Sequence, residues 1–357
     1  MLTRARATLL VTLLLVTAIL LAYGHHARAA APAPAAWRVL IYMAADNDLE
    51  PAAMNSLAEL QRVEGTGAIR VAAQIDRGAM REAAGKRWIG ARRFASTRGL
   101  LGGYRLEPVE DLGPIDSGAI DSLRAFVTWG MAAVPGEHTL LVLWGHGRGD
   151  RGLLLDASAR SHLSPQDVGA ALSGHMIDVL GMDICSMQTL DVASAVAGSA
   201  HYLAGSPSPR HALGWPYAAL LESLERSPTL SPRDASIWLA QHAGDRGEEF
   251  TGSALDLRRV PELVARVESL LVAARTLPPE ERARLLDGVE RLPTVAPAAR
   301  TVDLAAALTL FEAALPGEAR RARASLEASL IAEAHSPAFA DTAGVAVRRS
   351  RLGAEYR

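Results

Sequence analysis

The sequence predicts an α/β fold in which helices cover a mostly parallel β-sheet. Short apolar runs of strand length alternate with stretches of helical spacing, which is the pattern of parallel strands joined by crossover helices. Two runs, 138–144 and 177–182, are nearly continuous in apolar residues, as expected of strands buried on both faces. With 357 residues, 49% of them hydrophobic, the chain is long enough to bury a large core.

Periodicity places the individual elements in chain order. The predicted strands are 37–43, 68–75, 88–94, 104–109, 138–144, 177–182, 202–205 and 253–257. The predicted helices are 49–63, 117–134, 164–172, 187–196 and 261–277. Asp46-Asn47-Asp48 is expected to cap the first helix, and Ser164 followed by Pro165 is expected to open the third.

The last part of the chain differs in composition. Beyond about residue 278 it is rich in Ala, Arg, Glu and Leu, which predicts further helices, and "GVAV" at 344–347 predicts one late strand. A basic run near Arg320 is interpreted as a solvated helix face. We therefore expect a main domain over 37–257 and a mainly helical part over 258–357 that packs on it or continues it.

The N-terminus has the pattern of an export signal. Arg4 and Arg6 precede an uncharged apolar stretch, and a small-x-small cleavage pattern ends at Ala29. Residues 1–29 are thus expected to be a signal peptide and 30–36 an Ala/Pro linker, which predicts a secreted or periplasmic protein. The apolar stretch is also about as long as a short spanning helix, so an uncleaved segment that holds the protein at a membrane is the alternative.

Net charge and cysteine content narrow the classes of function that the protein can have. A formal net charge of −2 gives no reason to expect nucleic acid as a partner. Cys185 is the only cysteine, although export favours disulfides, which come in pairs. Three interpretations of Cys185 follow: a buried inert residue, an intermolecular disulfide, or a reactive thiol.

Two predicted buried strands end in polar turns that carry reactive side chains. "LLVLWGHGRG" places His146 and Gly147 after one strand, and "IDVLGMDICS" places Cys185 after the other. Because parallel strands present their carboxyl ends at one edge, neighbouring strands would bring His146 and Cys185 together. A thiolate attacks carbonyl carbon, and an imidazole transfers the proton. Gly147 and Cys185 could supply backbone N–H groups to an oxyanion, and Cys185 is expected just before a helix N-terminus.

Several segments, in the order "WRVLIYMAADNDLE", "LLVLWGHGRGD", "IDVLGMDICSM" and "GWPY", resemble the clostripain family of cysteine peptidases over roughly 37–257. The resemblance implies the caspase-like α/β/α sandwich, with a mostly parallel central sheet and a helical C-terminal elaboration. It implies His146 and Cys185 as the catalytic dyad, with Gly147 and Cys185 as the oxyanion hole. No third catalytic residue is evident.

Substrate contacts are expected around Asp183, which occupies the position of the family acid that binds a basic P1 side chain. The alternative is an Asp that caps the next helix. Ser206 and Trp215, in the loop over 205–217, are the other substrate-binding candidates. This loop contains no carboxylate and brings Arg210 and His211 instead, so strict specificity for Arg is in doubt. "GVAVRRSR" resembles a divergent form of the family's closing strand.

We therefore expect an exported cysteine endopeptidase that acts on proteins or peptides through a thioester acyl-enzyme, with a preference for Arg or Lys at P1. The alternative is an inactive caspase-like protein that binds peptides or surfaces. No HExxH or CxxC pattern predicts a metal site, and "DNDLE" is too short for an EF-hand loop. No cofactor is expected to be required, although calcium is implied for some members by the resemblance. The sequence does not determine the oligomeric state.

Overall fold

The computed structural model describes residues 34–78, 88–99, 103–247 and 249–353. The predicted signal segment over 1–29 lies outside these residues, and the predicted linker extends into the first strand at Ala35 and Ala36. Within the described residues, no helix has the length and apolar composition needed to cross a membrane. Residues from Ala35 onward form a single compact unit.

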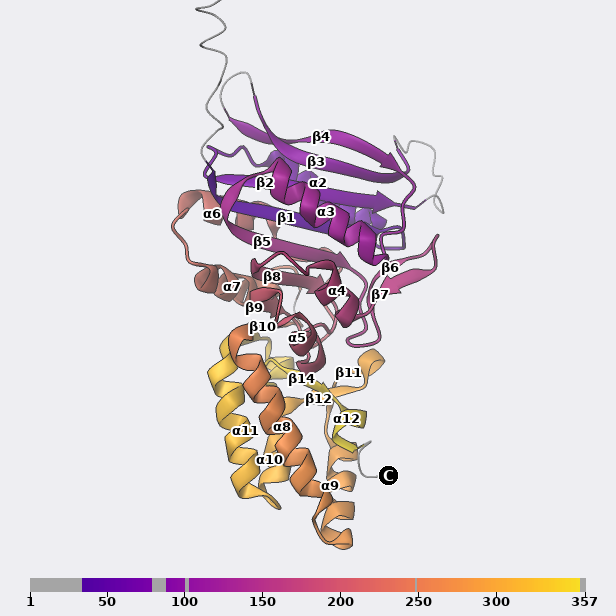
Figure 1. Ribbon diagram of the computed structural model, residues 1–357, viewed down its shortest axis with the longest axis vertical. Helices are drawn as coiled ribbons and strands as arrows, with labels where there is room; N and C mark the ends of the chain where they lie inside the picture. The colour runs from indigo at the N-terminus through magenta and orange to yellow at the C-terminus, as the bar shows by residue number, and fades with distance from the viewer. Residues whose placement is uncertain (1–33, 79–87, 100–102, 248, 354–357) are drawn as a thin grey trace, which may run out of the picture. The chain divides into compact units, whose positions relative to one another are not determined.

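A nine-stranded sheet organises this unit, in the order β13-β10-β9-β8-β5-β1-β2-β3-β4 (Figure 1). Its strands are β1 (Ala35–Ala45), β2 (Ile69–Arg77), β3 (Gly90–Arg98), β4 (Tyr104–Gly113), β5 (Gly136–Gly145), β8 (Ile177–Ile184), β9 (Ala200–Gly205), β10 (Thr251–Asp256) and β13 (Leu330–His335). The five strands from β9 to β2 pair in parallel, and antiparallel strands flank them on both sides. The expected mostly parallel centre is confirmed.

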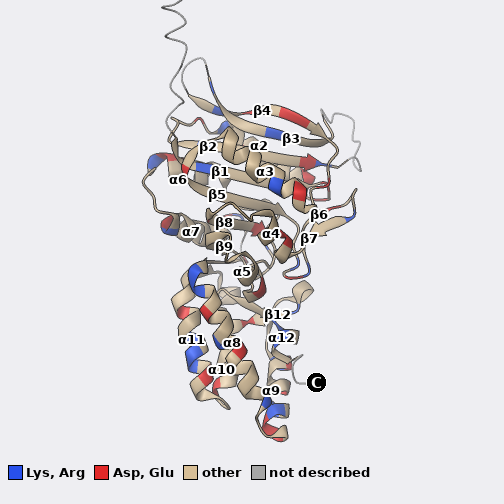
Figure 2. Cartoon of the chain, viewed as in Figure 1, with Lys and Arg blue, Asp and Glu red and all other residues tan. Residues whose placement is uncertain are grey.

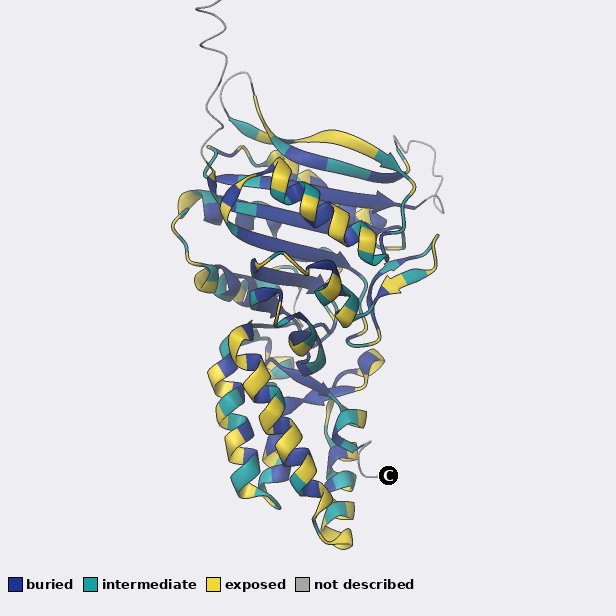
Figure 3. Ribbon diagram, viewed as in Figure 1, coloured by how far each residue is buried: buried dark blue, intermediate teal, exposed yellow. Residues whose placement is uncertain are grey.

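Helices cover both faces of the sheet (Figure 1). The helices of the main part are α2 (Glu50–Arg62), α3 (Ile120–Ala133), α4 (Pro165–Ala171), α5 (Leu190–Val196), α6 (Tyr217–Arg226) and α7 (Pro232–Gln241). Along β1, Leu40 and Tyr42 belong to a core shared with α3, α4 and α5, whereas Val39 and Ile41 belong to a core shared with α2, α6 and α7. Because successive strand side chains point to opposite faces, β1 can fill both cores. Figure 3 shows the central strands mostly buried.

The C-terminal part adds four longer helices and a small sheet. These helices are α8 (Val260–Arg275), α9 (Pro279–Arg291), α10 (Leu304–Glu312) and α11 (Pro316–Ser329). Leu263 and Val267 of α8 share one apolar core with Val192 and Val196 of α5, so this part continues the core of the main sheet. Charged residues of both signs occur along these helices (Figure 2), and Arg320 is exposed as predicted.

The remaining elements are short. They are the strands β6 (Leu153–Asp156), β7 (Ser161–Leu163), β11 (Thr294–Ala296), β12 (Thr301–Asp303) and β14 (Ala346–Arg348), the 3-10 helices η1 (His242–Gly244), η2 (Leu257–Arg259), η3 (Pro297–Ala299) and η4 (Pro337–Phe339), and α12 (Arg349–Gly353). The strand predicted at 344–347 forms as β14, but it does not close the main sheet. β14 pairs with β12, and β13 closes the main sheet by pairing with β10.

Candidate active site

The strands that carry His146 and Cys185 are neighbours, as the sequence predicts. β5 and β8 pair in parallel with Gly145 opposite Ile184, the last residue of each strand. His146 and Cys185 therefore follow paired positions at the carboxyl edge of the sheet, where β5 and β8 end. This is the edge at which parallel α/β sheets bind ligands.

Gly147 keeps the two turns in contact. A Cβ on Gly147 would lie 2.2 Å from Cγ2 of Ile184 and 2.9 Å from the carbonyl oxygen of Cys185, so no side chain fits here. Gly147 also forms an isolated β-bridge with Leu153. The two hydrogen bonds of this bridge are made by flanking residues: the Leu154 N–H donates to the His146 carbonyl at 2.8 Å, and the Arg148 N–H donates to the Gly152 carbonyl at 2.9 Å. Neither bond of the bridge involves the Gly147 N–H.

Asp48 is a partner of His146 that the sequence analysis missed. Oδ1 of Asp48 lies 2.7 Å from Nε2 of His146, at a separation of 98 residues along the chain. The segment around it was predicted to cap a helix, yet α2 begins after Leu49 without a side-chain cap, and it is Oδ1 of Asn47 that accepts from the Leu49 N–H at 3.0 Å. With Nε2 directed at a carboxylate, Nδ1 is the ring nitrogen left for a thiol.

Cys185 lies in a turn rather than directly before a helix. The helix that follows begins only at Leu190, where the Thr189 hydroxyl accepts from the Val192 N–H at 3.2 Å. The expected support of a thiolate by the helix dipole is therefore wrong, because that effect is confined to the first turn. Ser186 has φ 61°, an uncommon left-handed conformation, and the Ser186 N–H donates to the Ser208 carbonyl at 3.0 Å.

Within the described part of the chain, the hydrogen bonds of the Cys185 sulfur all involve the backbone of Arg210. The Arg210 N–H donates to Sγ at 3.3 Å, and the thiol lies 3.8 Å from the Arg210 carbonyl oxygen. Donation from an N–H group stabilises a negative sulfur. The loop after β9 thus contacts the nucleophile candidate directly.

Asp183 is buried among polar partners. Its side chain is 1% exposed, and its Oδ2 accepts from the Trp215 N–H at 2.9 Å and from the Tyr217 hydroxyl at 2.7 Å. Burial, followed by the negative charge of Asp183, raises the pKa of Tyr217, so this hydroxyl stays protonated and donates. The capping alternative for Asp183 is wrong, because Thr189 performs that role.

A guanidinium from the chain itself lies against this carboxylate. Nε of Arg210 donates to Oδ1 of Asp183 at 3.0 Å, and its Cζ lies 4.5 Å from the centre of the Trp215 ring. The Arg210 side chain is 6% exposed, and its Nη1 is buried without a hydrogen-bond partner among the described residues. Trp215 itself is buried and donates from Nε1 to the Leu239 carbonyl at 2.9 Å.

Gly214 explains how the loop reaches Asp183. It has φ 64°, and a Cβ there would lie 2.1 Å from Oδ2 of Asp183. Only glycine combines this backbone conformation with so close an approach. Gly214 and Trp215, the first two residues of the "GWPY" segment, therefore both lie against Asp183.

Ser206, the remaining predicted substrate-binding residue, is fully buried. Its hydroxyl lies 2.8 Å from Oγ1 of Thr251 and donates to the Ser208 carbonyl at 3.0 Å. With these partners, the hydroxyl anchors the base of the loop to β10.

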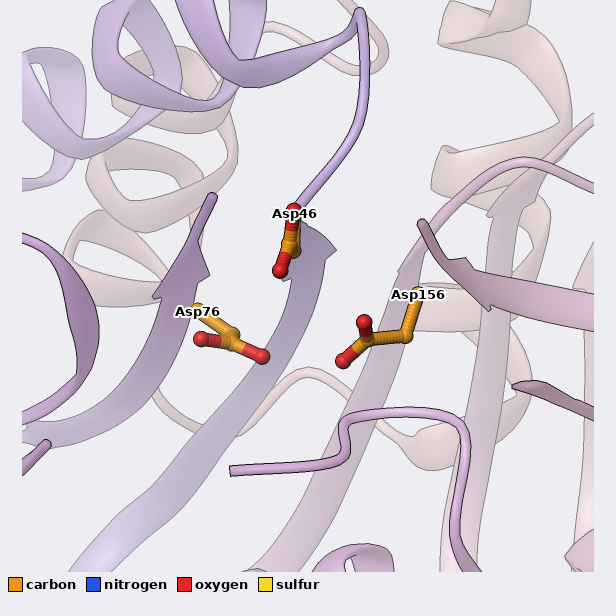
Figure 4. A group of neighbouring side chains, drawn as sticks. All are labelled: Asp46, Asp76 and Asp156. Atoms are coloured by element: carbon orange, nitrogen blue, oxygen red, sulfur yellow. The ribbon is translucent and has the colours of Figure 1, made fainter. Parts of the chain in front are cut away.

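Three buried carboxylates, those of Asp46, Asp76 and Asp156, gather near the active-site edge (Figure 4). Each contributes an oxygen within 4.8 Å of the others. Burial, together with the charges of Asp156 and Asp46, raises the pKa of Asp76 to about 8, and Oδ2 of Asp76 has no hydrogen-bond partner among the described residues. Oxygen ligands of this kind suit a hard cation such as Ca²⁺, so the residues fit the calcium implied for the family.

Comparison with known proteins finds solved structures that share this fold. The structure of an inactive zymogen C11 protease from Parabacteroides distasonis matches with a TM-score of 0.67 and 19% identity, covering 91% of this chain and 96% of that chain. A secreted C11 cysteine protease from Bacteroides thetaiotaomicron in complex with an irreversible peptide inhibitor matches with a TM-score of 0.65 and 17% identity, covering 87% of this chain and 92% of that chain.

The structure of a secreted C11 cysteine protease from the same organism, iotapain, matches with a TM-score of 0.67 and 14% identity, covering 89% of this chain and 94% of that chain. No curated protein sequence matches. At these identities the structures establish the fold, which is that of the C11 cysteine proteases. The family model described as the clostripain family matches residues 41–287, which is more than half of the chain, and the protein therefore belongs to the clostripain family of cysteine peptidases.

Proposed function

We propose that this protein is an exported cysteine endopeptidase that cleaves peptide bonds after a basic residue. The observation that carries the proposal is the convergence of His146, Cys185 and Asp183 at the carboxyl edge of the paired strands β5 and β8. A guanidinium already lies on Asp183 beneath Trp215, which supports a pocket chemically suited to arginine.

The proposed reaction assigns a role to each group. Nδ1 of His146 accepts the Cys185 thiol proton while Asp48 holds Nε2. The thiolate attacks the scissile carbonyl carbon and forms a C–S bond, and the Gly147 and Cys185 N–H groups stabilise the oxyanion. His146 then gives its proton to the leaving amine as the C–N bond breaks. Water, deprotonated by His146, hydrolyses the thioester and frees the thiol.

A peptide-library cleavage profile tests this proposal. Wild-type protein is expected to cleave after Arg or Lys, and Cys185→Ala is expected to cleave nothing. Efficient cleavage only after small or acidic residues would contradict the basic P1 preference.

N-terminal sequencing of the exported protein is expected to give a start after Ala29, whereas a start at Met1 would contradict a cleaved signal.

A non-catalytic peptide-binding function is the second candidate, because Arg210 covers both Asp183 and the sulfur of Cys185. A thiol-reactive peptidyl probe separates the two functions. Labelling of wild type but not of Cys185→Ala supports the peptidase. An unlabelled Cys185 in a protein that still binds peptide supports the alternative.

The chemistry itself is proposed to need no cofactor. A calcium ion would be held by Asp46, Asp76 and Asp156, where it would take the place of the proton that the raised pKa of Asp76 retains. Because Asp46 lies two residues before Asp48, the ion would also hold the segment that contacts His146.

A further inference from the structure

We infer that Arg210 is an internal occupant of the S1 pocket, which a basic P1 side chain must displace before cleavage. The inference rests on the proposed function and identifies the residue that controls entry to the pocket. It explains how a loop that contains no carboxylate can line a pocket for basic residues.

The contacts of Arg210 are those that a bound arginine would make. Its guanidinium meets Oδ1 of Asp183 at 3.0 Å and stacks 4.5 Å from the centre of the Trp215 ring. Charge-assisted bonds to carboxylate and stacking on indole are the two interactions that recognise arginine. A substrate arginine that uses the same carboxylate therefore competes with Arg210.

The pocket can hold only one guanidinium at a time. Oδ2 of Asp183 is already taken by the Trp215 N–H and the Tyr217 hydroxyl, which leaves Oδ1 for a cation. No second acid is present in the loop over 205–217 to pair with another positive charge. Two guanidinium groups beside one buried carboxylate would leave one charge uncompensated, which is strongly unfavourable.

Within the described residues, one donor of the Arg210 guanidinium is left unsatisfied. Nη1 is buried without a partner, and a buried donor left unsatisfied costs free energy. Pro209, His211 and Ala212 beside it are exposed, so this part of the loop can move without opening either core. The same movement would withdraw the Arg210 N–H from the sulfur of Cys185.

Arg210→Ala tests the inference, with His211→Ala as the control on the same exposed loop. Each protein is treated with an arginyl peptide acyloxymethyl ketone, and the labelling rate of Cys185 is measured by intact mass. We expect Arg210→Ala to be labelled about tenfold faster than wild type, which corresponds to a competing interaction of about 1.4 kcal/mol. His211→Ala is expected to react like wild type.

A binding readout independent of activity completes the test. Benzamidine and agmatine are expected to raise the melting temperature of Arg210→Ala, because they refill the vacated site, and to leave that of wild type unchanged. If folded Arg210→Ala reacts no faster and binds neither amine, Arg210 is a structural residue and the inference is wrong. If Arg210→Ala fails to fold, Arg210→Lys is used instead, because lysine keeps the positive charge but lacks the planar guanidinium group. The inference then requires Arg210→Lys to be labelled faster than wild type.

Two results distinguish this inference from the proposed function. Iodoacetamide needs no S1 pocket, so its reaction with Cys185 tests the thiol alone. If His146→Ala leaves that reaction unchanged, the proposed function fails whatever Arg210 does. If the thiol depends on His146 but Arg210→Ala brings no gain with the arginyl probe, only the role of Arg210 fails. Cleavage of wild type after Arg210 would also contradict it, because Arg210 would then be a substrate.

Discussion

At the scale of single residues, the contact between Asp48 and Nε2 of His146 leaves Nδ1 as the nitrogen for the thiol in the proposed reaction. The carboxylate of Asp48 lies 2.7 Å from Nε2, although 72% of the Asp48 side chain is exposed against 34% for His146. A carboxylate in this position fixes the ring orientation and stabilises the imidazolium that forms during catalysis. Solvent screening weakens that stabilisation, so orientation is its main contribution.

Asp48→Asn is therefore expected to lower kcat by about tenfold with little change in KM, because ring orientation and charge stabilisation act in the chemical step. Steady-state kinetics on an arginyl peptide measure both constants. Asp121→Asn is the control, because Asp121 is exposed and pairs with Arg124 along the same helix. An unchanged kcat in Asp48→Asn would show that Asp48 does not orient His146.

The residues at the ends of the two strands with the clearest apolar signal could be predicted, and the residues of other loops that contact them could not. Cys185, His146 and Asp183 were found because each follows or ends an apolar run. Arg210 and Asp48 reach the site from loops, at separations of 27 residues from Asp183 and 98 from His146. No periodicity links such pairs. The sequence therefore showed that the loop carries a positive charge, but not that Arg210 forms an ion pair with Asp183.

At the scale of elements, β14 and the residues around it hold the two catalytic turns together. The Ala346 N–H donates to the Gln188 carbonyl at 3.0 Å, which anchors the chain after Cys185. Arg348 forms an ion pair with Asp150 in the turn after His146. Burial raises the pKa of Asp150, and the charge of Arg348 opposes that rise. The small sheet thus contacts both turns.

Arg348→Ala is expected to lower catalytic efficiency by a few fold and the free energy of unfolding by about 1 kcal/mol or less, because the pair is partly exposed. Urea unfolding and peptide kinetics measure the two effects. Arg226→Ala removes an exposed pair within one helix and serves as the control. Equal effects of the two substitutions on catalysis would exclude a supporting role for β14.

The late strands also show why composition misled the prediction of elements. "LIAEAH" has helical composition, yet it forms β13 and closes the main sheet beside β10. Backbone pairing at the sheet edge outweighs a small difference in intrinsic propensity. Strands β5 and β8 could be predicted because burial on both faces leaves a continuous apolar signal.

At the scale of the whole molecule, the buried acids link stability to pH. The pKa of Asp76 is raised to about 8 in the folded protein, against about 3.9 for an unfolded chain. Between these values the folded state binds a proton that the unfolded state has released. Stability from this group is complete below about pH 4 and is lost as pH rises to about 8, at up to about 1.4 kcal/mol per pH unit.

Asp76→Asn is therefore expected to flatten the decline in unfolding free energy between pH 5 and pH 8. Urea unfolding at each pH measures the effect, with Asp121→Asn as the exposed control. Calcium is expected to stabilise wild type at pH 8 more than at pH 5, because the ion replaces the proton, and not to stabilise Asp76→Asn. A parallel decline in wild type and Asp76→Asn would show that this carboxylate is ionised throughout.

The central claim is that His146 activates Cys185, and the reaction of Cys185 with iodoacetamide tests it most directly. The rate at neutral pH is measured by mass spectrometry for wild type, His146→Ala and the control His175→Ala, whose ring lies beside the Thr128 hydroxyl. Wild type and His175→Ala are expected to react at least about tenfold faster than His146→Ala, because only they retain the base that makes the thiolate. Equal rates in all three proteins would contradict the account.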